Sequence, residues 1–280
     1  MMQSNKTFLL IAFLLTTIFN SRAQSYFDYE SSLKFANYLF ESKQYSEAAI
    51  EYERVLFLNP LDSVSRINQV KALRFSGNTS AAKNTLISFS GNNISHLSHP
   101  LAKEYCKLLI TENDFEGMGL YLQEVKKIPK TDISGYMYGL FLAQSKWKES
   151  AEYRFKNEVF LKNYSKYNEL YNVELKGLQE IYKKPWLATG LSMAAPGLGK
   201  VYSGQWKDAI YSFLFISAGG FLTYNSYQKN GFNKQTGILG GVTTSLYLVN
   251  IYGSFKSAGY YNSKKDKGYK KRVEAILLDE

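Results

Sequence analysis

Few side chains in this sequence combine the residue types and the spacing that catalysis or metal binding requires. His96 and His99 stand three residues apart, so both imidazoles could share one face of a helix, but neither has a neighbouring carboxylate or cysteine. Protein zinc sites use three or four such ligands, so the two histidines do not predict a metal site. Cys106 stands among Tyr105, Leu108 and other apolar residues, a setting that favours a buried thiol over a nucleophile.

The segment around Gly199-Lys200 resembles the end of a phosphate-binding loop. That loop requires the pattern G-x-x-x-x-G-K-[ST], in which backbone amides hold phosphates and the hydroxyl binds Mg²⁺. Here Ala194 replaces the first glycine and Val201 replaces the hydroxyl residue, so no ATP site is predicted. The paired carboxylates at positions 51 and 53, and at positions 149 and 152, fall on polar helix faces where solvation explains them. We therefore predict a protein that is not an enzyme and that has no catalytic residue, no metal and no cofactor.

The distribution of charge points to a membrane. The 280 residues carry a formal charge of +10, but residues 25–182 are neutral and residues 183–272 carry an excess of 11 positive charges. These basic residues flank the longest uncharged segments, as the positive flanks of membrane segments do. A nucleic-acid-binding domain would spread them over a folded face, so we expect no nucleic-acid partner. A single cysteine also excludes a disulfide within the chain.

The N-terminus has the three-part pattern of a secretory signal peptide, which we assign to residues 1–23. Lys6 precedes an uncharged run over residues 7–19, and Ser21 and Ala23 provide the small residues of a cleavage site. The run is shorter than the ~20 apolar residues of a membrane span, although an uncleaved anchor is the alternative. No cysteine follows it, which excludes a lipoprotein anchor. The sequence thus predicts a location at the bacterial cell membrane, with residues 25–182 on the periplasmic side.

Residues 29–60 show apolar residues at helical spacing on two stretches, separated by a polar break at residues 41–44. The residue before Pro60 is disfavoured in a helix, so the second stretch ends there. Two short antiparallel helices form the unit of a helical solenoid. The unit resembles a tetratricopeptide repeat, with Pro60 as its terminal proline, Tyr45 opening the second helix, Ala36 and Ala48 at the small positions and Tyr52 at the next large one.

Three further units, residues 63–89, 100–129 and 131–155, match this pattern less fully. They keep Gly77 at a turn, Ala82 at a small position, Phe115 after a turn and Trp147 at the aromatic position. Four units suffice for a continuous core, so we expect residues 25–182 to form a solenoid that ends in a further helix; a non-repetitive bundle is the alternative. The resemblance implies a groove that binds a protein partner. Candidate groove residues are Asn37, Asn68, Lys71 and Tyr105.

Residues 183–262 form the expected membrane module. Its hydrophobic segments are 185–202, 209–228 and 235–255; the last two have the length that a bilayer requires, although Ser, Thr, Gly, Asn and Tyr interrupt both. A buried soluble hairpin is the alternative. Because small residues let helices approach closely, we expect Gly219 and Gly220 to pack against Gly237 and Gly241, which have GxxxG spacing.

A short motif lies between the first two of these segments. Pro196, Gly197, Gly199, Tyr202 and Gly204 give the pattern P-G-x-G-x-x-Y-x-G. The pattern resembles the signature of the small two-transmembrane-helix domain family, and most closely that of an uncharacterised bacterial relative joined to tetratricopeptide repeats. The resemblance covers residues 183–260. It implies a membrane topology but no biochemical activity. At position 200, where relatives often carry glutamine, this chain has lysine.

The number of membrane crossings depends on the first segment. Two crossings would return the C-terminal tail, residues 263–280, to the exported side against the positive-inside tendency. A third crossing at residues 185–202, which we favour, would leave the tail in the cytoplasm, although this short, broken stretch could instead be re-entrant. The basic side chains of the tail could contact anionic lipid. They are Lys264, Lys265, Lys267, Lys270, Lys271 and Arg272.

The sequence as a whole predicts an all-α protein in which a tetratricopeptide-like helical solenoid is followed by a transmembrane helical hairpin. Its expected function is that of a non-enzymatic, membrane-anchored scaffold of the bacterial envelope, which recruits a protein partner through the exported solenoid. The alternative is an accessory subunit of a membrane transport or insertion complex, in which the C-terminal hairpin is the working part.

Overall fold

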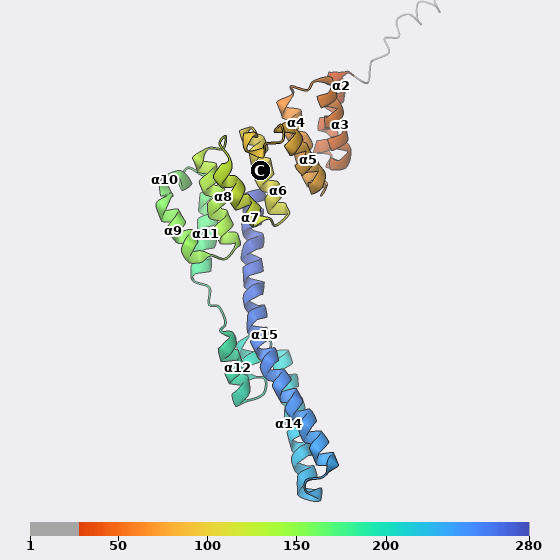
Figure 1. The fold of residues 1–280 in the computed structure, drawn as a ribbon, viewed down its shortest axis with the longest axis vertical. Coiled ribbons are helices and arrows are strands. Elements are labelled where there is room, and N and C mark those ends of the chain that lie inside the picture. The colour runs from red at the N-terminus through yellow and green to blue at the C-terminus, as the bar shows by residue number, and fades with distance from the viewer. Residues whose placement is uncertain (1–27, 280) are drawn as a thin grey trace, which may run out of the picture. The chain divides into compact units, whose positions relative to one another are not determined.

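A computed structural model describes residues 28–279, and every regular element in this part of the chain is a helix (Figure 1). The predicted all-α class is confirmed. The described residues divide into two compact units, unit 1 up to residue 128 and unit 2 from residue 129 onward. The signal peptide predicted at residues 1–23 lies outside the described residues.

Unit 1 contains three helix pairs whose turns share one backbone geometry. Three residues join the helices of each pair, and the middle one has a positive φ: 61° at Lys43, 80° at Gly77 and 60° at Asn113. Successive middle residues are 34 and 36 positions apart, close to the period of a helical repeat. The helices are α2 (Tyr29–Glu41), α3 (Tyr45–Leu58), α4 (Ser63–Phe75), α5 (Thr79–Phe89), α6 (His99–Thr111) and α7 (Phe115–Glu124), with the 3₁₀ helix η1 (Ile94–His96) before α6.

The first helix pair packs around two alanines. Ala36 of α2 and Ala48 of α3 are fully buried in one apolar cluster, and their small side chains let the two helices pack closely. Tyr52 is buried in the same cluster. Its hydroxyl donates to Asn37 Oδ1 at 2.8 Å and accepts from Asn68 Nδ2 at 3.3 Å, so this phenol has polar partners on α2 and α4.

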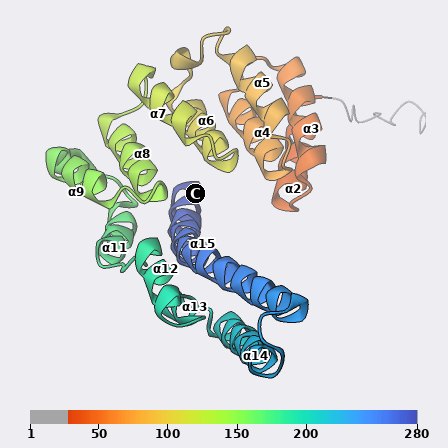
Figure 2. The ribbon, with the colours of Figure 1, turned by 60° about the horizontal axis from the view of Figure 1, so that its bottom comes forward.

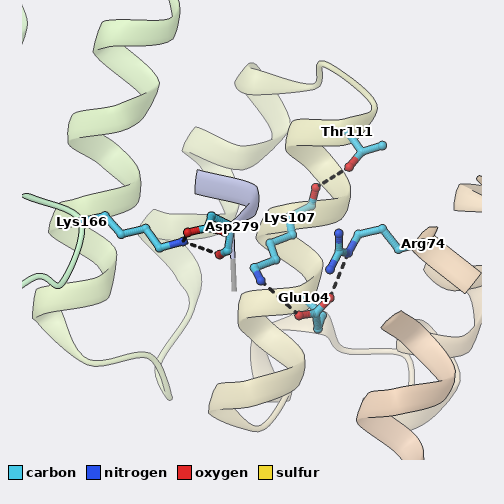
Figure 3. A network of polar contacts seen from close by, with 6 residues as sticks. All are labelled: Arg74, Glu104, Lys107, Thr111, Lys166 and Asp279. Carbon is cyan, nitrogen blue, oxygen red and sulfur yellow. Dashed lines mark hydrogen bonds and ion pairs between the residues drawn. The ribbon is translucent and has the colours of Figure 1, made fainter. Parts of the chain in front are cut away.

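A buried ion pair joins α4 to α6 in unit 1. Arg74 Nε donates to Glu104 Oε2 at 3.0 Å, and Lys107 Nζ lies 3.7 Å from Glu104 Oε1 (Figure 3). All three side chains are buried. Because desolvation of an ion costs several kcal/mol, one carboxylate shared by two cations is a strong constraint on how these helices pack.

Unit 2 begins with a fourth helix pair, α8 and α9, whose turn has the same geometry, with Ser145 at a φ of 55°. After α11 the chain passes through two short helices into a long hairpin, in which α14 and α15 lie side by side (Figures 1 and 2). Helix α15 extends beyond α14, passes α12 and packs against α8 and α11. The helices are α8 (Lys130–Ala143), α9 (Trp147–Lys156), α10 (Glu158–Leu161), α11 (Tyr167–Leu178), α12 (Pro185–Ala194), α13 (Leu198–Tyr202), α14 (Trp206–Asn230) and α15 (Lys234–Leu278).

Of the tail expected at residues 263–280, residues 263–278 are instead the last part of α15. Val273 and Leu277 are buried, and a Cβ added at Gly139 of α8 would lie 2.8 Å from Leu277 Cδ1. Lys166 donates to the backbone carbonyl of Asp279 and pairs with its carboxylate (Figure 3). The buried apolar residues of this segment, and not its charges, determine where it lies. The boundary expected between residues 182 and 183 falls inside unit 2.

The expected membrane segments differ in form from the prediction. Segments 209–228 and 235–255 lie in α14 and α15, but residues 185–202 form two short helices, and the ten residues of α12 extend only about 15 Å. Within residues 28–279, no helix combines the length and the apolar character needed to cross a bilayer. Ser, Thr, Asn and Tyr residues interrupt the apolar stretches of α14 and α15, and the two or three expected crossings are therefore not supported.

Candidate functional site

The glycine-rich motif forms a tight turn between α12 and α14. Gly197 has a φ of 88°, and a Cβ there would lie 2.4 Å from the carbonyl oxygen of Ala209. A Cβ at Gly199 would lie 1.9 Å from the carbonyl oxygen of Ala188. Both positions therefore require glycine, because the backbones of α12, α13 and α14 approach too closely for a side chain. Gly204, with a φ of 78°, follows α13 at the turn into α14.

Two buried hydroxyls connect the motif to α15. Ser192 Oγ accepts the backbone N–H of Gly199 at 2.9 Å and lies 2.6 Å from Ser254 Oγ. Ser254 Oγ in turn donates to the backbone carbonyl of Asn250 at 2.9 Å, so Ser192 supplies the proton between the two serines. Both serines are fully buried. The motif is thus fixed to the middle of α15.

A polar cleft lies among the apolar residues of the hairpin. Lys200 Nζ donates to Ser212 Oγ at 2.7 Å, and Lys200, Asp208 and Asn250 line a cavity of about 480 Å³ whose other walls are largely apolar. Asn250 is 3% exposed, and neither Nδ2 nor Oδ1 has a hydrogen-bond partner among the described residues. An unpaired buried polar group costs about 1–3 kcal/mol. The cation, the hydroxyl and the amide together have the donors and the acceptor to hold a small polar group.

The motif tyrosine helps to hold the segment that enters α12. The Tyr202 hydroxyl accepts the N–H of Lys184 at 3.1 Å, and Lys183 Nζ lies 4.7 Å from the centre of the Tyr202 ring. Asn262 of α15 accepts the N–H of Lys183 and donates to its carbonyl, both at 2.8 Å. The connection from α11 to α12 is therefore bound to α15 and does not act as a flexible linker.

A second set of polar contacts joins α15 to the residues that follow α11. The Tyr182 hydroxyl donates to Asp266 Oδ1 at 2.6 Å, and Glu180 accepts from the Tyr269 hydroxyl at 2.8 Å and pairs with Lys265 at 3.2 Å. The hydrogen bond from Tyr269 and the nearby Lys265 lower the pKa of Glu180. Burial and the hydrogen bond to Glu180 raise the pKa of Tyr269 to about 12. Near neutral pH, Glu180 therefore accepts as a carboxylate and Tyr269 donates as a phenol.

Of the four glycines expected at the contact between α14 and α15, only Gly219 lies there, and its neighbour on α15 is a threonine. A Cβ at Gly219 would lie 2.6 Å from Thr243 Oγ1, and a Cβ at Gly240 would lie 3.5 Å from Thr223 Cγ2. The GxxxG pair does not form the expected contact, because an added Cβ there would meet no atom within 4 Å. This open space is found at Gly220, Gly237 and Gly241.

The residues expected at repeat positions lie mainly inside the helix pairs. Tyr45 packs on Phe75, with ring centroids 5.0 Å apart, Gly77 occupies its turn, and Pro60 is exposed after α3. The remaining residues of this set are buried. They are Ala36, Ala48, Tyr52, Ala82, Phe115 and Trp147.

The side chains expected to line a binding groove are used within unit 1. Asn37 and Asn68 both bind the hydroxyl of Tyr52. Tyr105 is buried and lies edge-on to Tyr121, with 4.7 Å between the ring centroids. These three residues therefore stabilise the helix pairs, while Asn37, Asn68 and the fourth candidate, Lys71, remain partly exposed.

An exposed apolar patch surrounds the turn from α3 to α4. Phe57 and Leu61 are 85% and 86% exposed, and Val64 at the start of α4 is also exposed. Isolated exposed apolar residues are common, but three large ones around one turn on a neutral segment are typical of a protein-binding surface. We call these three residues the α3–α4 patch.

A more extended apolar surface covers the hairpin. Along α14, Leu214, Phe215 and Phe221 are more than half exposed, and along α15 the same is true of Leu248 and Val249. A hairpin of two helices can bury only the facing side of each helix, so its outer faces depend on a partner or a membrane for burial.

The two histidines and the cysteine lie in η1 and α6. His96 belongs to η1 and His99 begins α6, so the two do not share a helix face. Cys106 is fully buried. No group of three or more His, Cys, Asp and Glu side chains that could hold a metal ion occurs in the described part of the chain.

Several polar residues of α15, near the motif and the segment before α12, were not among the residues predicted from the sequence. Asn250, Ser254 and Ser257 are all buried on one face of α15. Their spacing of four and three residues inside an apolar segment is visible in the sequence, and it predicts small polar groups on a single helix face. Asn262 and Tyr269 gave no such signal, since their partners are more than 75 positions away in the chain.

The sequence matches no protein-family model and no curated protein, and the fold matches no solved structure, at the significance required of each comparison.

Proposed function

We propose that this protein is a non-enzymatic scaffold of the bacterial envelope, which the α14–α15 hairpin anchors to a membrane and which recruits a protein partner through its helix pairs. The observation that carries the proposal is the continuity of α15. One helix of 45 residues supplies half of the apolar hairpin and, at its other end, packs into the helix pair of the same unit. Such an element couples an anchor rigidly to a helical repeat.

The surface of the hairpin supports the membrane part of the proposal. Its exposed side chains are aliphatic and aromatic, and they include Trp206 at the start of α14 and Tyr252 in α15. Aromatic residues at the ends and lysines beyond them are typical of segments that sit in a membrane interface. The proposal requires insertion of these side chains and does not require that either helix cross the bilayer.

The α3–α4 patch supports the partner part of the proposal. Stacked helix pairs commonly bind a peptide or a helix of another protein, and Phe57, Leu61 and Val64 offer apolar anchors on a unit without excess charge. The signal peptide predicted at residues 1–23 would place this surface on the exported side of the membrane.

Two matched pairs of substitutions test the proposal in the full chain. Leu214→Asp with Leu248→Asp changes two exposed residues of the hairpin. In membrane fractionation, this variant should move from the membrane fraction to the soluble fraction. Phe57→Asp with Leu61→Asp changes two exposed residues of unit 1, and should retain membrane binding but lose crosslinks to the partner in native envelopes. Equal membrane retention by both pairs would contradict the anchor.

The alternative, in which the hairpin is the working part of a transport or insertion complex, is favoured by the cleft of Lys200, Ser212 and Asn250. Polar residues inside apolar segments are costly and commonly mark a functional path. Complementation of a strain that lacks the gene separates the two functions. Loss of complementation by Lys200→Met and Asn250→Leu, with retention in the Phe57→Asp/Leu61→Asp variant, would favour the alternative over the scaffold.

A further inference from the structure

A basic cavity lies at the base of the apolar hairpin in unit 2. It has a volume of about 530 Å³ and is bounded by the turn from α13 to α14 and by one face of α15. Gln205 lines it directly before α14 begins, and Tyr260 lines it five residues after the apolar segment 235–255 ends. The cavity therefore lies at the junction between the apolar part of the hairpin and the polar part of α15.

The cavity has an excess of positive charge. Lys264, Lys265 and Arg272 line it, and Glu180 is its one acidic residue. Glu180 already pairs with Lys265 at 3.2 Å and accepts the hydroxyl of Tyr269. Lys264 and Arg272 have no carboxylate within ion-pair distance among the described residues, so two cations remain for a ligand. An arginine and a lysine that converge on one cavity are typical of phosphate recognition.

A glycine keeps this face of α15 hollow. Gly268 lines the cavity in the interior of a helix, where glycine costs about 1 kcal/mol relative to alanine. No packing contact explains it, because a Cβ at Gly268 would meet no atom within 4 Å. The missing side chain leaves space for a ligand between the cationic side chains of the cavity.

We infer that this cavity binds the phosphate group of an anionic phospholipid, with Arg272 and Lys264 contacting the phosphate oxygens. The choice of a lipid rests on the proposed function, because insertion of the hairpin would bring this level of α15 to the headgroup region. The recognition chemistry is that of a phosphate anion, which inorganic phosphate shares.

Vesicle binding of the full chain tests the inference with two charge-matched pairs. Lys264→Gln with Arg272→Gln removes two cations from the cavity, and Lys267→Gln with Lys271→Gln removes two from the same helix outside it. On phosphatidylcholine vesicles that contain phosphatidylglycerol, we expect the cavity pair to weaken binding about tenfold or more relative to the control pair. On vesicles of phosphatidylcholine alone, both pairs should bind like the unaltered protein. Equal losses in the two pairs would overturn the inference, because they would indicate diffuse attraction by net charge.

A substitution without charge change gives a second test. Gly268→Leu should fill the cavity and reduce binding to the phosphatidylglycerol vesicles, whereas Gly259→Leu, also at an open position of α15, should not. Thermal unfolding would verify that both variants are folded. Unchanged binding by a folded Gly268→Leu variant would overturn the inference.

Titration of the detergent-solubilised chain with inorganic phosphate separates the cavity from the anchor. Weak saturable binding that the Lys264→Gln/Arg272→Gln variant lacks would support the site even if the unaltered protein failed to bind any vesicle, a result that would contradict the anchor alone. Binding of phosphate with equal strength by unaltered protein and variant would count against the site.

Discussion

The indole of Trp147 lies directly against Gly177, where an added Cβ would come within 2.3 Å of Cε3. The contact brings the first residue of α9 onto α11. The same indole donates from Nε1 to the Tyr182 hydroxyl at 3.1 Å and packs edge-on against Tyr269, with ring centroids 4.9 Å apart. One side chain therefore connects the fourth helix pair, the segment after α11 and helix α15.

Substitution of Gly177 tests this junction. Gly177→Ala should destabilise unit 2 by about 1–3 kcal/mol, because a rigid, buried ring cannot move away from the new methyl group without repacking. The measurement is chemical denaturation of the full chain followed by tryptophan fluorescence. Gly259→Ala is the control, since its Cβ would face open space, and it should leave the protein equally or more stable.

The buried end of α15 is tested by shortening one side chain. Leu277 is 1% exposed and lies against Gly139, so Leu277→Ala should cost about 2–5 kcal/mol and increase hydrogen exchange in α8. Leu278→Ala, one position further on and less buried, should have a smaller effect on both measurements. If the two variants behaved alike, the end of α15 would be a peripheral tail as the sequence analysis expected.

The ion pair of unit 1 is tested by removal of its charge. Glu104→Gln should destabilise unit 1 by about 3–5 kcal/mol, because Arg74 and Lys107 would lose the carboxylate that they share in a buried setting. Glu158→Gln in α10 removes the carboxylate of an exposed ion pair with Lys162 and should change stability little, because solvent screens such a pair. Denaturation curves of the two variants against the unaltered chain give the comparison, and a smaller loss for Glu104→Gln than for Glu158→Gln would refute it.

The contact between Glu180 and Tyr269 predicts how stability depends on pH. The lowered pKa of Glu180 contributes stability above its ordinary value of 4.5, and this contribution is lost as the pH falls through the lowered pKa. The raised pKa of Tyr269 contributes stability at pH values below its ordinary pKa of 10. This contribution is lost as the pH rises from 10 to about 12. Tyr269→Phe should remove about 1 kcal/mol near neutral pH and flatten the alkaline decline. An unaltered alkaline slope in the variant would argue against the assignment.

Much of the repeat architecture could be read from the sequence, because it depends on local rules. Helical spacing in residues 29–60, the proline after α3 and the glycine at position 77 act within one or two turns of the chain. They predicted helix pairs close to those observed. The motif glycines at positions 197 and 199 were also identifiable by type, although the close approaches that require them, to Ala209 and Ala188, were not.

The candidate sites depend on contacts that the sequence leaves unspecified. Residues 263–280 were predicted as a basic tail from their charge, yet Val273 and Leu277 determine their position, because burial of apolar area outweighs the mutual repulsion of solvated lysines. Likewise, Asn250 and Ser254 lie in an apolar segment of the sequence, and only the packing of the motif turn beside them identifies them as part of a polar site.

The sequence by itself determined the helical class, the positions of the paired helices and the uneven distribution of charge, because helix periodicity and composition are local properties. Only the tertiary structure decided that the basic segment continues a long helix, that it packs on the helix pair of its own unit, and that Lys264 and Arg272 converge on one cavity. These outcomes depend on which distant surfaces bury one another, and no local pattern in the chain fixes that choice.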